Sequence, residues 1–189
     1  MSYKKYKFPI NIFLCFEKKT PTYYTSQVLT KNHYVCFIPK KWYYGLNLFI
    51  KKELFYNSSF LVEMSAIDTL KYNKIIPDVE FFNFKDRFLV YSVYYFYFIK
   101  VRITFVQSTN NNVDSIDSIY KNASWLEREV SEMFGINFIN KKDNRSLLLD
   151  YSRNEFPMLK DFPTEGYRDI FYDFFENKID YFQNEFVEL

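Results

Sequence analysis

The cluster Glu127-Arg128-Glu129 brings two carboxylates and a guanidinium close together in the sequence and is therefore a candidate catalytic group. Two carboxylates held side by side could act as a general acid and a general base. Residues two apart on a helix point about 200° away from each other, however, so Glu127 and Glu129 cannot form such a pair. Arg128 and Glu132 are four apart, and this spacing predicts a surface ion pair. We therefore expect these charges to hold structure and not to catalyse.

Nucleophiles, metal ligands and phosphate-binding loops are scarce. His33 is the sole histidine, so serine and cysteine side chains lack a base, and we expect His33 itself to be structural or solvated. Cys15 and Cys36 form no C-x-x-C motif and predict two buried or idle thiols in a reducing compartment. Three widely separated glycines cannot build a dinucleotide fingerprint. The sequence predicts no catalytic residue, no metal site and no cofactor bound by this chain.

Composition places the chain among folded proteins. It has 189 residues, of which 23% are aromatic, with 23 Phe and 18 Tyr against 3 Gly. Disordered proteins are poor in aromatic residues, and a chain of this length buries about 70% of its unfolded surface, so one domain is expected. The abundant residue types have A/T-rich codons, which favours an organellar genome.

Charge is unevenly distributed along the chain. Residues 1–52 contain ten lysines and one acid, whereas residues 53–189 contain 15 basic and 22 acidic residues. The first segment either meets acidic protein, nucleic acid or lipid headgroups, or is a solvated lysine-rich surface. The longest apolar run near the N-terminus, Ile12 to Phe16, is far shorter than the ~20 residues of a membrane span. We expect no transmembrane segment.

The best-defined element is a helix over residues 115–134. Apolar residues from Ile116 to Phe134 recur with helical period, with Asp114 or Ser115 as the expected N-cap and Gly135 as the C-cap.

Two residues break the pattern of this helix. Glu127 falls in the middle of the apolar face and must find a cation or hydrogen-bond donors there. Trp125 falls at the centre of the polar face. It marks either a contact surface, because tryptophan is enriched in interface hot spots, or an isolated exposed tryptophan.

The remaining pattern predicts an α+β fold. The run Arg87–Val106 would be about 65 Å long as one strand, so it must turn back among residues Tyr95–Lys100. We expect a single domain with a mixed or antiparallel sheet, packed by two helices and followed by a long extended C-terminal tail. The expected strands lie near 34–38, 60–70, 87–95 and 99–106, and the helices near 40–53 and 115–134. The expected divisions are a basic aromatic arm (1–33), a core (34–150) and a tail (151–189).

Several motifs in order resemble one known family. The block from Ala123 to Ile136, which contains Glu127-Arg128-Glu129, Glu132 and Met133-Phe134, continues with Lys141, Arg145 and Leu147-Leu148. Pro157, Lys160-Asp161-Phe162-Pro163 and Gly166-Tyr167 follow. This series resembles the subunit 9 family of mitochondrial respiratory complex I, the 30 kDa subunit, which has a bacterial counterpart. Leu159 and Ser146 stand where the family has arginine, and Asn144 and Glu155 replace leucine and glycine.

The resemblance implies a cofactor-free structural subunit in the peripheral arm of complex I, on the matrix side of the mitochondrial inner membrane. Its implied partner is the quinone-site subunit, subunit 7 or its bacterial counterpart, in an obligate hetero-oligomer, with the tail on neighbouring subunits and no nucleic acid. FMN, iron–sulfur clusters and ubiquinone are expected in other subunits of this NADH:ubiquinone reductase. The residues that the resemblance assigns to docking and framework are Trp125, Glu127, Arg128, Glu129, Arg145, Lys160, Asp161, Phe162, Pro163 and Tyr167.

Two other classes of function remain open on the residues alone. An organellar RNA-associated protein would use the lysine- and tyrosine-rich arm, although the acidic balance over residues 53–189 argues against it. A stand-alone redox enzyme lacks the expected cofactor ligands.

Overall fold

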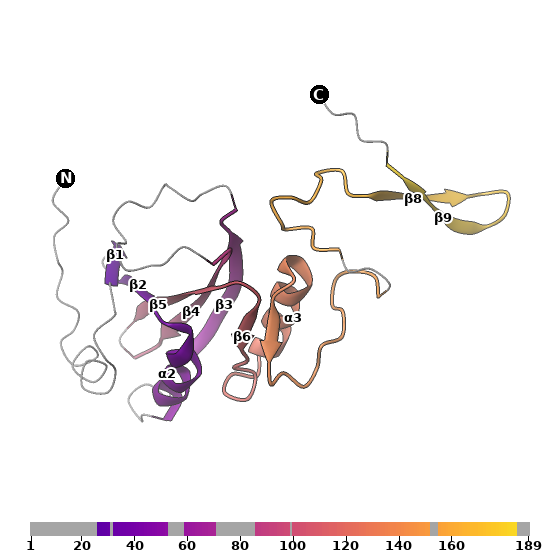
Figure 1. Cartoon of the computed structure of the whole chain (residues 1–189). Coiled ribbons are helices and arrows are strands. Elements are labelled where there is room, and N and C mark those ends of the chain that lie inside the picture. The colour runs from indigo at the N-terminus through magenta and orange to yellow at the C-terminus, as the bar shows by residue number, and fades with distance from the viewer. Residues whose placement is uncertain are drawn as a thin grey trace.

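A five-stranded mixed sheet forms the centre of the protein (Figure 1). The computed structural model describes residues 26–30, 32–52, 59–70, 86–98, 100–151 and 155–184. The strand order is β1-β2-β5-β4-β3, and all neighbours are antiparallel except the parallel pair β2 and β5. The strands are β1 (Ser26–Thr30), β2 (His33–Phe37), β3 (Ser59–Asp68), β4 (Phe88–Phe96) and β5 (Val101–Thr109).

Two helices and two smaller strand pairs complete the described chain. The α+β class, the mixed sheet and the two helices agree with the sequence prediction. The parallel pair β6 and β7 was not expected from the sequence. These elements are α2 (Lys40–Lys52), β6 (Asn112–Asp114), α3 (Ala123–Phe134), β7 (Asn137–Ile139), β8 (Arg168–Asp173) and β9 (Lys178–Gln183).

The long aromatic run turns back where the sequence predicted. Strand β4 ends at Phe96, β5 begins at Val101, and these two residues are register partners. Lys100 adopts the left-handed φ of 52° that the turn requires. Strand β5 extends beyond the predicted end at 106, because Gln107 and Thr109 still point into the buried side of the sheet. Residues 107–109 therefore belong to the strand, and the predicted end at 106 is wrong.

One face of the sheet and both helices share a single core. Alternate residues of β4 and β5 point into it, and α2 adds Tyr43, Leu46 and Ile50. Cys36 of β2 is a free thiol buried in this core, as the sequence predicted, and burial raises its pKa to about 12. Cys15 lies outside the described residues.

Helix α3 is shorter than predicted. It begins at Ala123 and not near residue 115, and its N-cap is Asn122, which makes no side-chain capping hydrogen bond. Residues 115–122 form isolated turns in which Ile119 and Tyr120 donate backbone hydrogen bonds to the Ile116 carbonyl. These turns place apolar residues in the core at helical spacing, and so they imitate a helix in the sequence. Gly135 ends the helix with a left-handed φ of 72°, as predicted.

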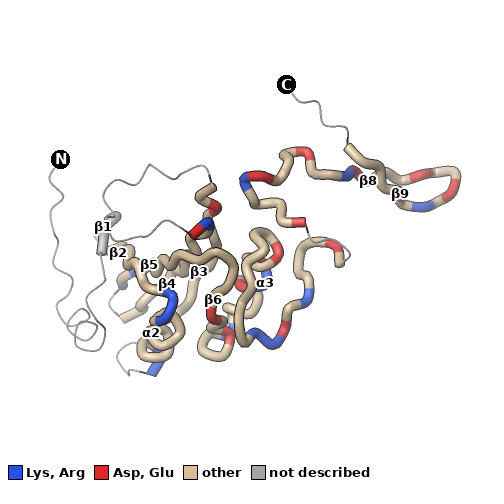
Figure 2. The backbone as a smooth tube through the Cα atoms, viewed as in Figure 1, with Lys and Arg blue, Asp and Glu red and all other residues tan. Residues whose placement is uncertain are grey.

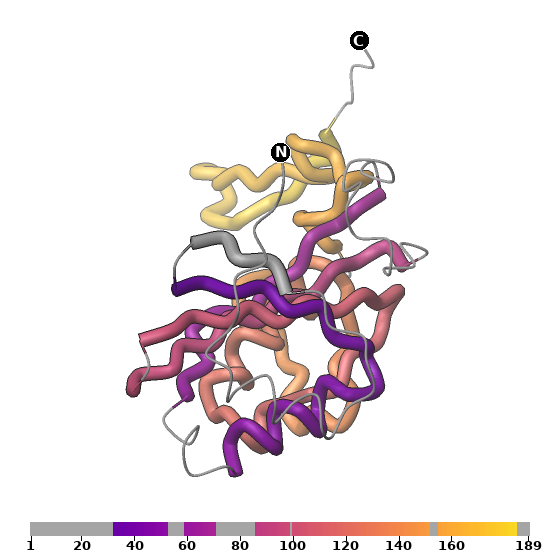
Figure 3. The backbone as a smooth tube through the Cα atoms, turned by 90° about the vertical axis from the view of Figure 1, so that its left-hand side faces the viewer, coloured from indigo at the N-terminus to yellow at the C-terminus, as the bar shows by residue number. Residues whose placement is uncertain are grey.

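The ends of the chain differ in part from the expected arm and tail. Strand β1 lies inside the segment predicted as the N-terminal arm, of which residues 1–25 lie outside the described chain. The segment predicted as an extended tail contains the antiparallel hairpin β8–β9. Both views place this hairpin away from the five-stranded sheet (Figures 1 and 3). Its aromatic side chains are therefore exposed, as described below.

Candidate partner-docking framework

The carboxylate of Glu127 lies at the centre of a buried polar cluster. Its side chain is fully buried and accepts hydrogen bonds from the Ile116 amide at 2.7 Å and the Ser115 hydroxyl at 2.8 Å. The Lys141 ammonium lies 3.1 Å from the same carboxylate, with its side chain only 1% exposed. The sequence expectation that Glu127 must find a cation and donors is thus confirmed.

Burial is also the largest influence on the titration of this group. Desolvation raises the pKa of Glu127, while the hydrogen bonds from Ile116 and Ser115 and the charge of Lys141 act in the opposite direction. Lys141 also donates to the Ser124 carbonyl at 2.8 Å. The cluster therefore ties helix α3 both to the turn before it and to the loop after β7.

Arg128 binds the loop that follows β7. Its guanidinium donates to the carbonyls of Arg145 at 2.8 Å and Ser146 at 2.9 Å, and it lies 3.7 Å from the Asp143 carboxylate. The Arg145 side chain forms two hydrogen bonds to Asp143, which lower the pKa of that carboxyl. Arg145 and Arg128 thus meet at one loop.

The expected Arg128–Glu132 ion pair is wrong, because both side chains find backbone partners. Glu132 accepts hydrogen bonds from the amides of Leu147, Leu148 and Leu149 at 2.8–3.1 Å. Burial opposes the charged form of Glu132, but these amides outweigh it and hold its pKa below the ordinary value. Consecutive backbone N–H groups that converge on one carboxylate fix the path of this loop.

A second ionic cluster fixes the segment Lys160-Asp161 to the sheet. The Asp68 carboxylate at the end of β3 accepts two hydrogen bonds from Arg87, at 3.0 and 2.7 Å. The same carboxylate accepts the Lys160 amide at 3.0 Å, and Arg87 also pairs with Asp161. Burial works against the charged form of Asp68, yet the Arg87 and Lys160 hydrogen bonds lower its pKa overall. Asp161 is therefore part of the internal framework.

The segment around residue 160 also packs on helix α3. A Cβ added to Gly135 would lie 3.0 Å from the Phe156 ring, so this glycine allows a close approach as well as its left-handed turn. The Met158 amide donates to the Met133 carbonyl at 3.1 Å. Leu159 packs against the core.

The predicted residues Phe162, Pro163 and Tyr167 form a small unit beyond this segment. The rings of Phe162 and Tyr167 meet edge to face at 5.1 Å, and the Gly166 amide donates to the Pro163 carbonyl at 3.0 Å. The Tyr167 carbonyl accepts the Asn184 amide at 3.1 Å, which joins this unit to the end of β9.

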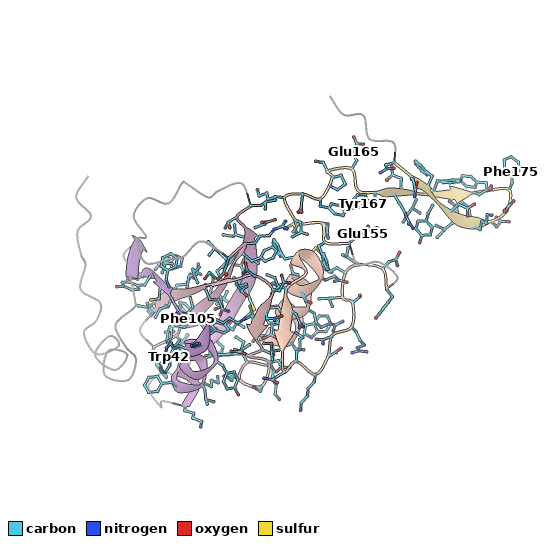
Figure 4. All side chains as sticks on the ribbon, viewed as in Figure 1. Trp42, Phe105, Glu155, Glu165, Tyr167 and Phe175 are labelled. Carbon is cyan, nitrogen blue, oxygen red and sulfur yellow. The ribbon has the colours of Figure 1, made fainter. Side chains whose placement is uncertain are left out.

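Other predicted residues face outward. Trp125 is 62% exposed, which confirms its place on the solvent side of α3, and the Arg128 guanidinium carbon lies 5.5 Å from its ring centroid. Glu129 and Lys160 are also exposed. In Figure 4 Tyr167 lies near the base of the hairpin and Phe175 at its tip. The ten predicted residues therefore divide into an internal framework and an outward set.

Sequence reasoning missed several members of the framework. Lys141 belongs to the motif series quoted above, but nothing in the local spacing of Asp68, Arg87 or Lys141 shows that they meet Asp161 or Glu127. The only available signal was a charge directly beside a β-rich run, as at Asp68 and Arg87. His33 serves as structure, as expected, through a 2.8 Å hydrogen bond between its Nε2 and the Thr104 hydroxyl.

The described part of the chain contains no helix long and apolar enough to cross a bilayer. Within the same residues no three His, Cys, Asp or Glu side chains converge as metal ligands would.

Comparison with known proteins shows similarity along most of the sequence. The family described as "Respiratory-chain NADH dehydrogenase, 30 Kd subunit" matches residues 38–168. NADH-ubiquinone oxidoreductase subunit 9 of Paramecium primaurelia is 38% identical over 98% of this chain and 88% of its own length. A bacterial relative, an NADH-quinone oxidoreductase subunit of Cereibacter sphaeroides, is 40% identical over 43% of this chain and 41% of its own length.

A solved structure shares the fold. A chain in the structure of the membrane-bound sulfane sulfur reductase, an archaeal respiratory membrane complex, superposes with a TM-score of 0.62 at 16% identity. The superposition covers 81% of this chain and 84% of the other. The matched range 38–168 contains the buried Glu127–Lys141 cluster and the Asp68–Arg87–Asp161 cluster. This chain belongs to the family of the 30 kDa subunit of respiratory-chain NADH dehydrogenase.

Proposed function

We propose that this chain is a cofactor-free structural subunit of respiratory complex I that supports the quinone-site subunit, subunit 7. Its place is the peripheral arm, on the matrix side of the mitochondrial inner membrane. The complex transfers electrons from NADH to ubiquinone and translocates protons, while FMN, the iron–sulfur clusters and the quinone pocket lie in other subunits. The names of the relatives, which are subunits of NADH-ubiquinone and NADH-quinone oxidoreductases, support membership of such a complex.

One observation carries this proposal. The charged motif residues Glu127, Arg128, Glu132 and Asp161 are engaged by this chain's own loops and strands. They therefore act as a rigid frame, and the large aromatic side chains among the predicted residues that this frame leaves exposed are Trp125 and Tyr167. A tryptophan that is 62% exposed and covered on one side by Arg128 is already oriented for contact.

The β8–β9 hairpin supports the same conclusion. Phe174 and Phe175, in the turn between the strands, are 81% and 98% exposed, and both faces of the hairpin carry further exposed apolar residues. Exposed apolar surface of this kind marks an interaction site. The hairpin is two-stranded, and an isolated hairpin is marginally stable in water. We therefore assign it to docking on neighbouring subunits in an obligate hetero-oligomer.

Replacement of the tryptophan tests the proposal. A Trp125→Ala chain is expected to enter the assembled complex about tenfold less well, a loss of about 1.4 kcal/mol of association. The melting temperature of the isolated variant chain should change little, because the ring is exposed. The measurement is the ratio of this chain to subunit 7 in complexes purified through a tag on this chain.

Lys121→Ala is the matched control, since Lys121 is an exposed residue of the turn directly before α3 and is not among the predicted docking residues. It should leave assembly unchanged. A complex that contains this chain but no subunit 7 would reject the supporting role. If Trp125→Ala lowered the melting temperature of the isolated chain as well as its incorporation into the complex, the tryptophan would instead stabilise the fold of this chain.

A further inference from the structure

Helix α2 carries an outer surface that its own fold does not explain. The sequence of this helix, Lys40–Lys52, contains four lysines and no acid. Figure 2 shows blue at the helix ends and no red along it. Its apolar face is occupied by the core, so the opposite face is what the helix presents. We name the outer surface formed by Lys41, Trp42, Gly45 and Lys52 the α2 ridge.

Gly45 is the first unexplained feature of the α2 ridge. It lies in the middle of the helix, where glycine is less favourable than alanine. Apart from its two chain neighbours and the helix's own backbone, a Cβ added there would meet no atom of the described residues within 4 Å, and Gly45 has no left-handed φ. Gly135 and Gly166, the other two glycines, both have left-handed φ angles. Gly45 is thus the one glycine without a reason inside the described chain.

The lysines of the first turn are the second feature. Lys40 and Lys41 lie at the N-terminal end of α2, where the helix dipole disfavours positive charge. Within the described residues, neither they nor Lys52 form an ion pair. Lys51, by contrast, lies over the Tyr120 ring at 5.1 Å. Two positive charges placed against the helix dipole and a glycine in mid-helix each weaken α2, and no ion pair in the described part of the chain compensates the two charges.

The exposed tryptophan of the ridge is the third feature. Trp42 is 40% exposed, three residues before Gly45, and Figure 4 shows it on the outer side of the helix. At 100° per residue Lys41, Gly45 and Lys52 fall within about 40° of one another. The bare backbone at Gly45 is therefore flanked by positive charge and an aromatic ring.

We propose that the α2 ridge binds an acidic, extended segment of a neighbouring polypeptide whose backbone packs against Gly45. Lysine ammonium groups attract carboxylates, and only a glycine lets a second backbone approach so closely. The inference rests on the proposed function only in that the chain has protein partners. It uses no residue of α3 or of the β8–β9 hairpin, so it defines a separate contact.

Charge and burial favour a protein partner over other anionic surfaces. A membrane-binding helix inserts its apolar face into the bilayer, but Tyr43, Leu46 and Ile50 of α2 are buried in the core. Nucleic acid recognition favours arginine and several stacking rings, whereas α2 has no arginine and the ridge has one ring.

Zero-length cross-linking of the assembled complex tests the contact directly. Carbodiimide joins an amine only to a carboxylate that it touches. We expect Lys41 or Lys52 to be joined to an aspartate or glutamate of another polypeptide, identified by mass spectrometry. Cross-links only to this chain's own acids, or recovery of lipid or RNA as the bound material, would overturn the proposal.

Gly45→Ala should change the stability of the free chain and its incorporation into the complex in opposite directions, and this difference distinguishes a contact at the α2 ridge from an effect on the fold. The methyl group should raise the melting temperature of the free chain by about 1–4 °C, because alanine favours helix. It should lower incorporation into the complex about tenfold, because it separates the two backbones. Incorporation that is unchanged or improved would overturn the proposal, as would a lowered melting temperature.

Lys41→Glu provides the charge test. An acid at this end of the helix favours helix stability, yet it should repel the acidic partner and reduce incorporation. Lys142→Glu is the matched control, an exposed lysine in the loop after β7, and should leave incorporation unchanged. Equal effects of the two substitutions would show that net charge and not the ridge is responsible. Loss of incorporation in Trp125→Ala but not in Gly45→Ala would reject the ridge and leave the proposed function intact.

Discussion

The carboxylate of Glu127 and the ammonium of Lys141 form a salt bridge of 3.1 Å between side chains that are 0% and 1% exposed. Both ions have left water, so each depends on the other and on the Ser115, Ile116 and Ser124 groups that complete their hydrogen bonds. A buried pair of this kind fixes the geometry of α3 relative to its flanking loops. Loss of one ion leaves the other without compensation.

Glu127→Ala should therefore destabilise the chain strongly. Removal of one partner of a buried ion pair costs about 3–5 kcal/mol, and the stranded Lys141 is the reason. The free energy of unfolding in urea measures the effect. Glu129→Ala, on the exposed side of the same helix, should stay within about 0.5 kcal/mol of the native chain. A similar small change for Glu127→Ala would refute its buried role.

Acid should detach the loops held by Asp68 and Glu132. The folded pKa of each lies below its ordinary value of 3.8 or 4.5, so the unfolded chain binds more protons. Their stabilisation is present above these values and is lost as the pH falls through the lower folded pKa. Protection against hydrogen exchange at the amides of Lys160 and Leu148, relative to the intrinsic exchange rate at each pH, should thus fall below about pH 4. Protection that stays constant down to about pH 2 would contradict this expectation.

Arg87→Ala should release the segment around Lys160 and leave Asp68 uncompensated. We expect a loss of about 2–3 kcal/mol, since Arg87 is itself partly exposed at 29%. The amide of Lys160 should lose protection more than the amides of β4. Arg87→Lys should recover only part of the effect, because an ammonium cannot reproduce the two-pronged contact. Arg102→Ala, at an exposed arginine of β5, is the control and should change little.

Two glycine substitutions should separate backbone strain from steric conflict. Gly135 and Gly166 have nearly equal left-handed φ angles of 72° and 71°. A Cβ at Gly166 meets its nearest atom at 4.0 Å, whereas one at Gly135 meets the Phe156 ring at 3.0 Å. Alanine at 166 should cost about 1 kcal/mol for the backbone alone, and alanine at 135 should cost more. Equal melting temperatures for the two variants would show that Phe156 moves aside freely.

Local periodicity revealed some of this framework and misled elsewhere. The position of Glu127 on the apolar face of α3 required a buried partner, and the sequence alone could say so. The same periodicity continued through residues 115–122, where separate turns repeat the spacing of a helix, and it placed the helix start too early. The spacing of apolar residues shows which side chains point inward. Separate turns can produce this spacing as well as a helix does.

Contacts between distant segments could not be read from the sequence. Asp68 and Lys160 are 92 positions apart, and Arg87 and Asp161 are 74 apart. Each of these residues sits in a strand end or loop where many partners would satisfy it. The β8–β9 hairpin was equally hidden, because its residues are polar and aromatic without a strong strand pattern. The motifs identified the family, but only the fold shows which of their charges are engaged by the chain's own loops and strands.

The 92-residue interval between Asp68 and Lys160 also sets an order of events during synthesis. At ~5–20 residues per second, a ribosome needs about 5–20 s to extend the chain from one residue to the other. Through that interval the Asp68 carboxylate lacks the Lys160 amide, and Arg87 lacks Asp161, so this end of the nascent sheet must stay hydrated. The sheet can form first, but its charged edge closes only after Lys160 and Asp161 have been synthesised.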